Sequence, residues 1–111
     1  MRVYSTQFHQ GRDDTGWTYL LSDPSFIVVV RDIDAFFGGG AEGGAANFVG
    51  NLGQTFAYFP FTGLESASFS WRGRQVFLPG QSFGMTTSGL IGPGPAPGVD
   101  VMVSGYLLSV D

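Results

Sequence analysis

The sequence predicts an all-β protein, an antiparallel β-sandwich or jelly roll of about seven or eight short strands with Gly/Pro-rich loops. Val99, Val101 and Val103 alternate with Asp100, Met102 and Ser104 before residues 105–108, and this period of two is the one that the two faces of an extended chain require. Similar short segments recur upstream between Gly and Pro residues. A sustained helical period is found nowhere in the chain. These observations together favour strands throughout.

Size and composition predict one domain that covers residues 1–111. The chain has 111 residues and is 43% hydrophobic, with 11 Phe, 4 Tyr and 2 Trp, which is enough for one continuous core. Cysteine is absent, so disulfides, thiolate metal centres and a catalytic thiol are excluded. Because a small domain has little interior, we expect some of the rings to lie at the surface and contact a neighbouring chain.

The strands are predicted from short apolar or alternating segments. The strongest covers residues 26–36, whose β-branched start at 27–30 indicates a central strand covered on both sides, with an amphipathic second half. The complete set of predicted strands is 2–8, 17–21, 26–36, 54–61, 66–71 continued by 75–78, 82–87, and the closing strand from 99.

Gly and Pro mark the predicted connections. We expect a Gly-rich loop at residues 38–44, followed by at most one irregular helical turn at 45–51. Pro60 is expected to end one strand and Gly73 to interrupt another, and Pro79-Gly80 is expected to form a turn. The remaining predicted turns are 10–16, Asp23-Pro24 and the long segment 89–98.

The charge excludes several partners. The formal net charge is −4, from nine acidic residues against five arginines and no lysine, so a basic surface for nucleic acid is missing. Arg72 and Arg74 would share one face of a strand, which suits carboxylate contacts. The longest apolar run, residues 26–30, is too short to span a membrane, and no targeting segment is visible. We therefore expect no nucleic acid and no membrane as partners, and synthesis in the cytoplasm.

Three glycines have the spacing of a dinucleotide-binding motif, but the surrounding sequence does not fit that motif. Gly38, Gly40 and Gly43 fit G-x-G-x-x-G after a strong strand. The fingerprint also needs a helix and a second parallel strand, for which Pro60 and the surrounding glycines leave no room. We expect no bound cofactor.

The acidic residues do not predict a metal site. Asp32 and Asp34 share a strand face but lack a dense acidic loop around them. We interpret them as a solvated face paired with Arg31, Arg72 or Arg74.

A catalytic site is not predicted either. The single histidine, His9, lies near Asp13 and Asp14 in a polar region, which is typical of ordinary surface. A G-x-S-x-G motif is absent. We therefore expect no catalytic residues, no bound metal and no enzymatic activity, although two facing carboxylates of a glycosidase remain an alternative.

The aromatic pair Phe69 and Trp71, flanked by Arg72 and Arg74, allows two interpretations. The rings could form a platform on which a sugar stacks. Alternation alone also explains them as core residues that contact a neighbouring subunit, and we favour that interpretation.

The sequence resembles small virion proteins of tailed bacteriophages, especially those of actinobacteria. The resemblance lies in the run Trp71-Arg72-Gly73-Arg74-Gln75-Val76 with the following Pro79-Gly80, in Val103-Ser104-Gly105-Tyr106-Leu107-Leu108, and in Val30-Arg31-Asp32-Ile33. These stretches hold 18 of the 111 residues of the chain. The resemblance implies a multimeric β-sandwich component of the capsid or tail and implies no catalytic residues.

The interpretation from the residues and the resemblance agree on a non-enzymatic virion structural protein, a capsid-decoration or minor tail component. Its partners would be its own copies, most simply in a trimer that protects edge strands, and the major capsid or tail proteins. The alternative is a carbohydrate-binding host-recognition module on a tail or fibre, and a small enzyme is a third hypothesis. The expected interface residues are Phe69, Trp71, Arg72, Arg74 and Tyr106, with Val76 on the same strands.

Overall fold

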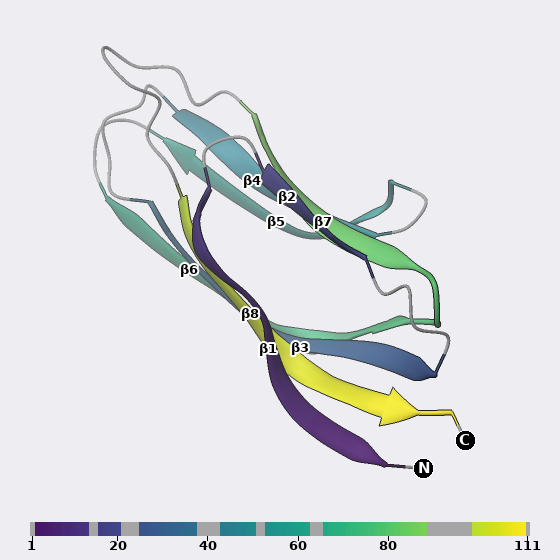
Figure 1. Cartoon of the computed structure of the whole chain (residues 1–111). Helices are drawn as coiled ribbons and strands as arrows, with labels where there is room; N and C mark the ends of the chain where they lie inside the picture. Colours follow the sequence, from purple (N-terminus) through teal and green to yellow (C-terminus); the bar gives the residue numbers. More distant parts are fainter. Residues whose placement is uncertain are drawn as a thin grey trace.

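Eight strands form two facing antiparallel sheets (Figure 1). The computed structural model describes residues 2–13, 16–20, 25–37, 43–50, 53–62, 66–88 and 99–110. The first sheet has the order β1-β8-β3-β6 and the second sheet the order β2-β7-β4-β5. This is the strand order of an eight-stranded jelly roll, so the predicted fold class is confirmed. The strands are β1 (Val3–Asp13), β2 (Gly16–Leu20), β3 (Phe26–Phe37), β4 (Gly43–Val49), β5 (Thr55–Thr62), β6 (Ala67–Phe77), β7 (Ser82–Ser88) and β8 (Val99–Ser109).

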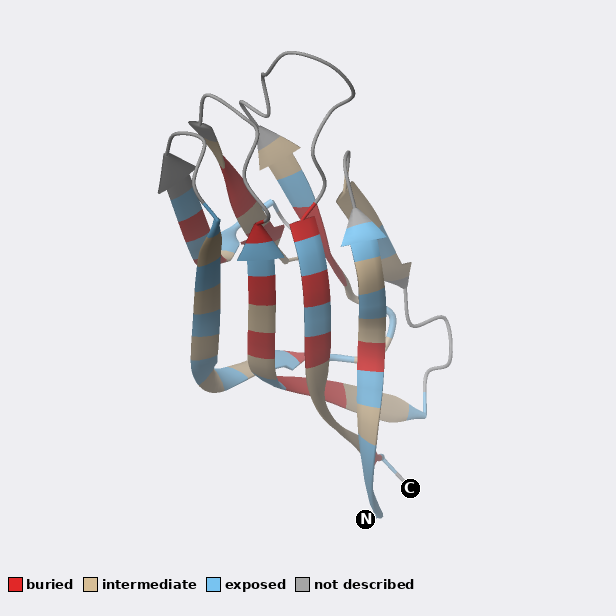
Figure 2. Ribbon diagram, turned by 90° about the vertical axis from the view of Figure 1, so that its left-hand side faces the viewer, coloured by how far each residue is buried: buried red, intermediate tan, exposed pale blue. Residues whose placement is uncertain are grey.

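The hydrophobic core fills the space between the two sheets. More buried and more exposed residues alternate along β6 and along the first half of β8 (Figure 2), because successive side chains point to opposite faces. Rings from both sheets meet in the core: Phe77 of β6 stacks on Phe83 of β7 with centroids 5.1 Å apart, and Phe69 stacks on Phe59 at 5.5 Å. The largest fully buried side chains are Phe37, Phe48, Ile33, Met85, Val28, Val29, Val30, Val99 and Val103.

The predicted central strand is confirmed. β3 pairs with β8 on one side and with β6 on the other. Val28, Val29 and Val30 are all at most 1% exposed, which agrees with the continuous apolar run that predicted burial on both faces.

A row of irregular pairing crosses the first sheet. The register shifts at Phe8 on β1 and at Arg31 on β3, and two residues of β6, Gly73 and Arg74, stand opposite Arg31. Near this row β3 and β6 bend sharply (Figure 2), as β-bulges make strands do. The bulge at Arg31 also changes which residues of β3 face the core, since Val28 and Val30 precede it and Ile33, Ala35 and Phe37 follow it.

The segment after the Gly-rich run corrects a prediction. A loop followed by an irregular turn was expected, but residues 43–49 form β4, which is hydrogen-bonded to β5 and β7. Ala46 and Phe48 are fully buried against the core. Two ladders and this burial outweigh the low strand propensity of Gly and Ala.

Three predicted strand ends were also wrong. β5 continues through Pro60 to Thr62, which is tolerated because β5 is an edge strand. Gly73 does not interrupt β6, since β6 runs unbroken from Ala67 to Phe77. β1 continues to Asp13, so it replaces most of the predicted turn at 10–16. The Asp23-Pro24 turn, residues 38–42 and the segment 89–98 lie outside the described residues.

The turn at Pro79-Gly80 is confirmed. The Gln81 amide donates a 3.0 Å hydrogen bond to the Leu78 carbonyl, and Gly80 has a φ of 86°. Pro at the second position and a positive-φ Gly at the third are typical of a type II turn.

Among the described residues, no helix is long and apolar enough to span a membrane.

Candidate binding surfaces

The five residues expected at an interface lie on opposite faces of the first sheet. Phe69 and Trp71 point inward and pack against the core cluster. Arg72, Arg74 and Tyr106 occupy the alternate positions of β6 and β8, and the register places them on the outer face. Of the five residues, only Arg72, Arg74 and Tyr106 are therefore available on the outer surface of the first sheet.

The core interpretation of Phe69 and Trp71 is confirmed. Phe69 lies parallel to Phe59 of the second sheet, with 6° between the ring planes. Trp71 contacts Phe56 edge to face, with centroids 5.7 Å apart. A sugar platform built on Trp71 would need the face of the indole open to solvent, and this packing argues against it. A role for the two rings between subunits stays a prediction.

Arg72 links two carboxylates of its own chain. Its Nη2 lies 2.9 Å from Oδ1 of Asp34, and its Nε lies 3.3 Å from Oδ1 of Asp32. This confirms the predicted pairing of the two aspartates across the sheet. The hydrogen bond from Arg72 lowers the pKa of Asp34, burial opposes this, and a 2.9 Å hydrogen bond from Ser70 Oγ lowers the pKa further. The hydrogen bond to Asp34 raises the pKa of Arg72, burial opposes this, and the negative charges of Asp34 and Asp32 raise the pKa further.

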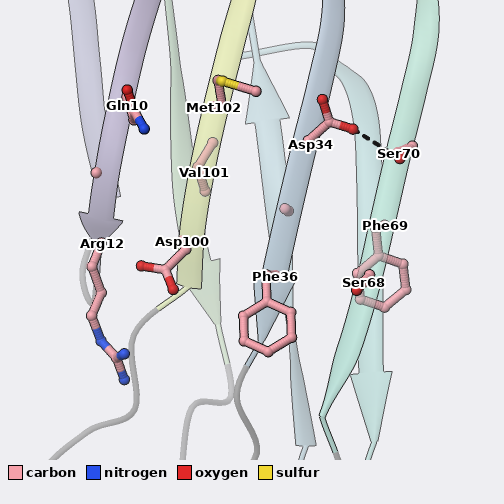
Figure 3. A pocket seen from close by; sticks show the side chains of 12 residues that line it. Gln10, Arg12, Asp34, Phe36, Ser68, Phe69, Ser70, Asp100, Val101 and Met102 are labelled. Atoms are coloured by element: carbon pink, nitrogen blue, oxygen red, sulfur yellow. Dashed lines mark hydrogen bonds between the residues drawn. The ribbon is translucent and has the colours of Figure 1, made fainter.

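Two rows of side chains line an open groove of about 450 Å³ on the outer face (Figure 3). Cross-strand partners on β1, β8, β3 and β6 form each row. Neighbouring strands lie about 4.8 Å apart and successive side chains of one face about 7 Å apart, so the eight side chains form a grid. We call this site the outer groove; its first row is Arg12, Asp100, Phe36 and Ser68, and its second row is Gln10, Met102, Asp34 and Ser70.

Apolar and acidic groups alternate at the centre of the outer groove. Phe36 is 45% exposed and Met102 is 40% exposed, and they are diagonal neighbours in the grid. Asp34 and Asp100 occupy the other diagonal. Figure 3 shows the ring of Phe36 beside the carboxylate of Asp100, with Arg12 at one edge and Ser68 at the other.

Sequence reasoning missed the outer groove, although one signal for it was present. Asp32, Asp34 and Phe36 stand two apart on the same strand, so the aspartates and the ring share a face. The continuous apolar run at the start of β3 hides which face this is, because the bulge at Arg31 reverses the inward positions. Only the structure reveals that the face is the outer one.

The part of the first sheet beyond the bulge row has an apolar outer face. Val29 is 0% exposed, yet it does not belong to the core cluster between the sheets. It lies on the outer face of the first sheet, between its register partners Tyr106 and Val76. We call this surface the apolar half-face; its apolar members are Val3, Ile27, Val29, Val76, Tyr106 and Leu108, and the polar Ser5 stands opposite Tyr106.

The described part of the second sheet carries no charged residue at all. Its four strands and the described residues that flank them contain neither Asp, Glu, Lys nor Arg. Tyr58 stands on the edge strand β5 and is 55% exposed. We call its outer side the uncharged face; the register assigns to it Gly16, Thr18, Ala45, Asn47, Tyr58, Pro60, Gly84 and Thr86.

The other sequence motifs do not form sites in the described structure. Gly43 of the apparent fingerprint begins a strand where the motif requires a helix, and Gly38 and Gly40 lie outside the described residues. His9 stacks on Trp17 with centroids 4.2 Å apart. Across the described ranges, no group of three or more His, Asp or Glu could hold a metal ion. Asp14 and the side chain of Asp13 are outside them.

Comparison with known proteins gives little. No protein-family model matches the chain, and no curated protein matches it. Among solved structures, the chain is similar to a chain in the structure of infectious bursal disease virus, Gx strain, with a TM-score of 0.36 and 12% identity. The similarity covers 98% of this chain and 32% of that chain. This chain thus spans about a third of the viral chain.

Proposed function

We propose that this protein is a non-enzymatic structural component of a bacteriophage virion, an accessory decoration or minor tail protein. It would bind the assembled particle and copies of itself, and its location would be the virion. The jelly-roll fold agrees with this proposal but does not select it, because viral capsid domains, lectins and cupins share the architecture. The support must come from the surfaces.

The uncharged face is the observation that carries the proposal. Charged residues are depleted at the centre of protein interfaces, because a charge that loses its water without a partner is costly. Thr18, Asn47 and Thr86 could be covered without that cost. Tyr58 adds a half-exposed ring of the kind that interfaces favour. We infer that copies of this chain pack on this face.

A closed trimer needs two different surfaces on each subunit, since its interfaces are head-to-tail. The apolar half-face supplies a second surface, with Tyr106 on the inner strand β8 and Val76 on the edge strand β6. Tyr106 is thus the predicted interface residue that the exposed apolar surface supports best. Arg72 already has two carboxylate partners in its own chain, and Arg74 is exposed beside the bulge row.

Analytical ultracentrifugation of the recombinant protein tests the assembly. The wild type should sediment as a closed oligomer and Thr86→Glu as a monomer, because the new carboxylate would be buried in the contact. Gln54→Glu adds the same charge at an exposed turn position outside both surfaces and should leave the oligomer intact.

Electron microscopy tests the location. Antibodies against the protein should label purified phage particles, on the head or on the tail. A monomeric wild type together with unlabelled particles would overturn the proposal.

A further inference from the structure

The outer groove has the composition of a site for a neutral saccharide. We propose that it binds a neutral oligosaccharide, with Phe36 as the ring on which a sugar stacks and Asp100, Arg12 and Gln10 as its hydrogen-bonding partners. This binding function goes beyond the proposed virion role and does not depend on it, because the groove and the uncharged face belong to different sheets.

The exposed ring of Phe36 is the apolar part of the site. The phenyl group of Phe36 is nearly half exposed in the middle of a sheet face, so it leaves apolar surface in contact with water. One face of a pyranose ring carries mainly C–H groups, and these pack on an aromatic plane. Met102 extends the apolar area diagonally from Phe36, so one further sugar unit has a contact surface next to the first.

The polar side chains match the other edge of a sugar. Vicinal hydroxyls donate to a carboxylate and accept from a guanidinium or amide. Arg12 and Asp100 stand opposite each other in the first row, and neither side chain forms a hydrogen bond or ion pair with another described residue. Gln7 Nε2 donates a 2.7 Å hydrogen bond to Oε1 of Gln10, which orients the Gln10 amide and keeps its Nε2 hydrogens as donors.

The charges favour a neutral ligand. Asp34 and Asp100 lie within the groove and Asp32 lies just beyond it. Arg72, the nearest cation on β6, is already held by Asp32 and Asp34. A phosphate, sulfate or carboxylate on the ligand would therefore meet unfavourable charge at the centre of the groove, whereas hydroxyl groups would not.

The site is also preorganised. Ser70 and Arg72 both donate to Oδ1 of Asp34, so its carboxylate is fixed. All eight side chains of the groove stand on strands of one sheet, and sites on such elements hold their geometry better than sites on loops. An open groove along a sheet suits a chain of sugar units better than a single small molecule.

The test uses the recombinant full chain on an immobilised panel of neutral gluco-, manno- and galacto-configured tri- to hexasaccharides. Sulfated and sialylated oligosaccharides and a tetralysine peptide stand on the same panel. Calorimetry then gives the dissociation constant for the best neutral probe. We expect binding to neutral probes alone. Phe36→Ala and Asp100→Asn should each weaken it by about tenfold or more, since a lost stacking or charge-assisted contact is worth at least that factor.

Two control variants make the result specific. Phe36→Tyr keeps an aromatic plane and should bind like the wild type. Tyr4→Ala removes a ring of matched exposure, 42%, at the far end of β1 and should also bind like the wild type. Circular dichroism verifies that each variant folds. The proposal is overturned if no neutral probe binds, if the acidic probes or the peptide bind better, or if Phe36→Ala binds as well as the wild type. Sedimentation of the same samples reports on assembly separately.

Discussion

The indole of Trp71 lies across Gly73, the residue two positions further along β6. A Cβ added to residue 73 would come within 2.6 Å of Cζ2 of that ring. The indole is itself held against Phe56, so it cannot move aside freely. The glycine that was expected to interrupt the strand therefore makes room for a core side chain within it.

Gly73→Ala should destabilise the protein by about 1–3 kcal/mol, the usual cost of overpacking a filled core. Urea unfolding followed by Trp fluorescence measures the change. Gly11→Ala is the matched control on β1, because its new Cβ would meet only ordinary contacts, the nearest at 3.7 Å from His9 Nε2. Equal stability of both variants would contradict the crowding argument.

Gly105→Ala should be more damaging than Gly73→Ala. Here the added Cβ would collide with the backbone carbonyl oxygen of Val29, next to the bulge at Arg31. The backbone of β3 is held by ladders on both sides and has no rotamer to change, so the strands themselves must separate. We expect little folded protein at room temperature, as measured by the near-ultraviolet circular dichroism of the aromatic core. A normal spectrum with an unchanged melting temperature would show that the sheet tolerates the shift.

Gly80→Ala should cost about 1–2 kcal/mol through the backbone alone, because a side chain disfavours positive φ. The φ of Gly80 is 86°, and an added Cβ would meet no atom within 4 Å. Gly80→Asn should cost less, since Asn adopts this conformation more readily. Thermal melts of the two variants provide the comparison, and an alanine variant as stable as the wild type would exclude a positive φ at this turn.

The pair Arg72–Asp34 should make stability depend on acidity. The pKa of Asp34 is lowered from its ordinary value of 3.8, so the folded state favours the ionised carboxylate. The stabilisation is complete above pH 3.8 and is lost as the pH falls through the lower folded-state pKa. Asp34→Asn should therefore flatten the loss of stability in this acid range.

The effect should be small and sensitive to salt, because both partners are substantially exposed. Urea titrations at several acidic pH values measure it. In an Arg72→Gln background, Asp34→Asn should change the pH profile much less than in the wild type. The same change in both backgrounds would assign the effect to other carboxylates.

The sequence predicted the fold class because alternation and turn residues are local signals. Residues 99–109 and the Pro79-Gly80 turn are examples in which local preference and the final structure agree. β4 could not be predicted in this way. Its Gly and Ala residues have low strand propensity, and only the ladders to β5 and β7, which are distant in sequence, fix them as a strand.

The candidate surfaces were predictable only in part. The pairing of Asp32 and Asp34 with Arg72 followed from side chains two apart on strands that could be neighbours. Which face Phe36 occupies depends on one unpaired residue, Arg31, and an extra residue in a ladder leaves no clear signature in the sequence. The strand order, which separates the charged outer face from the uncharged one, was likewise not accessible.

Because β8 lies between β1 and β3, the first sheet cannot form before residues 99–109 have been synthesised. In the described structure β8 is the sheet neighbour of β1, and it is one of the two neighbours of β3. Until residues 99–109 have been synthesised, the apolar strand β3 of the nascent chain therefore lacks one of its two neighbouring strands. Contacts so distant in sequence form slowly, so we expect production of this protein to respond to translation speed and to chaperones that cover exposed strands.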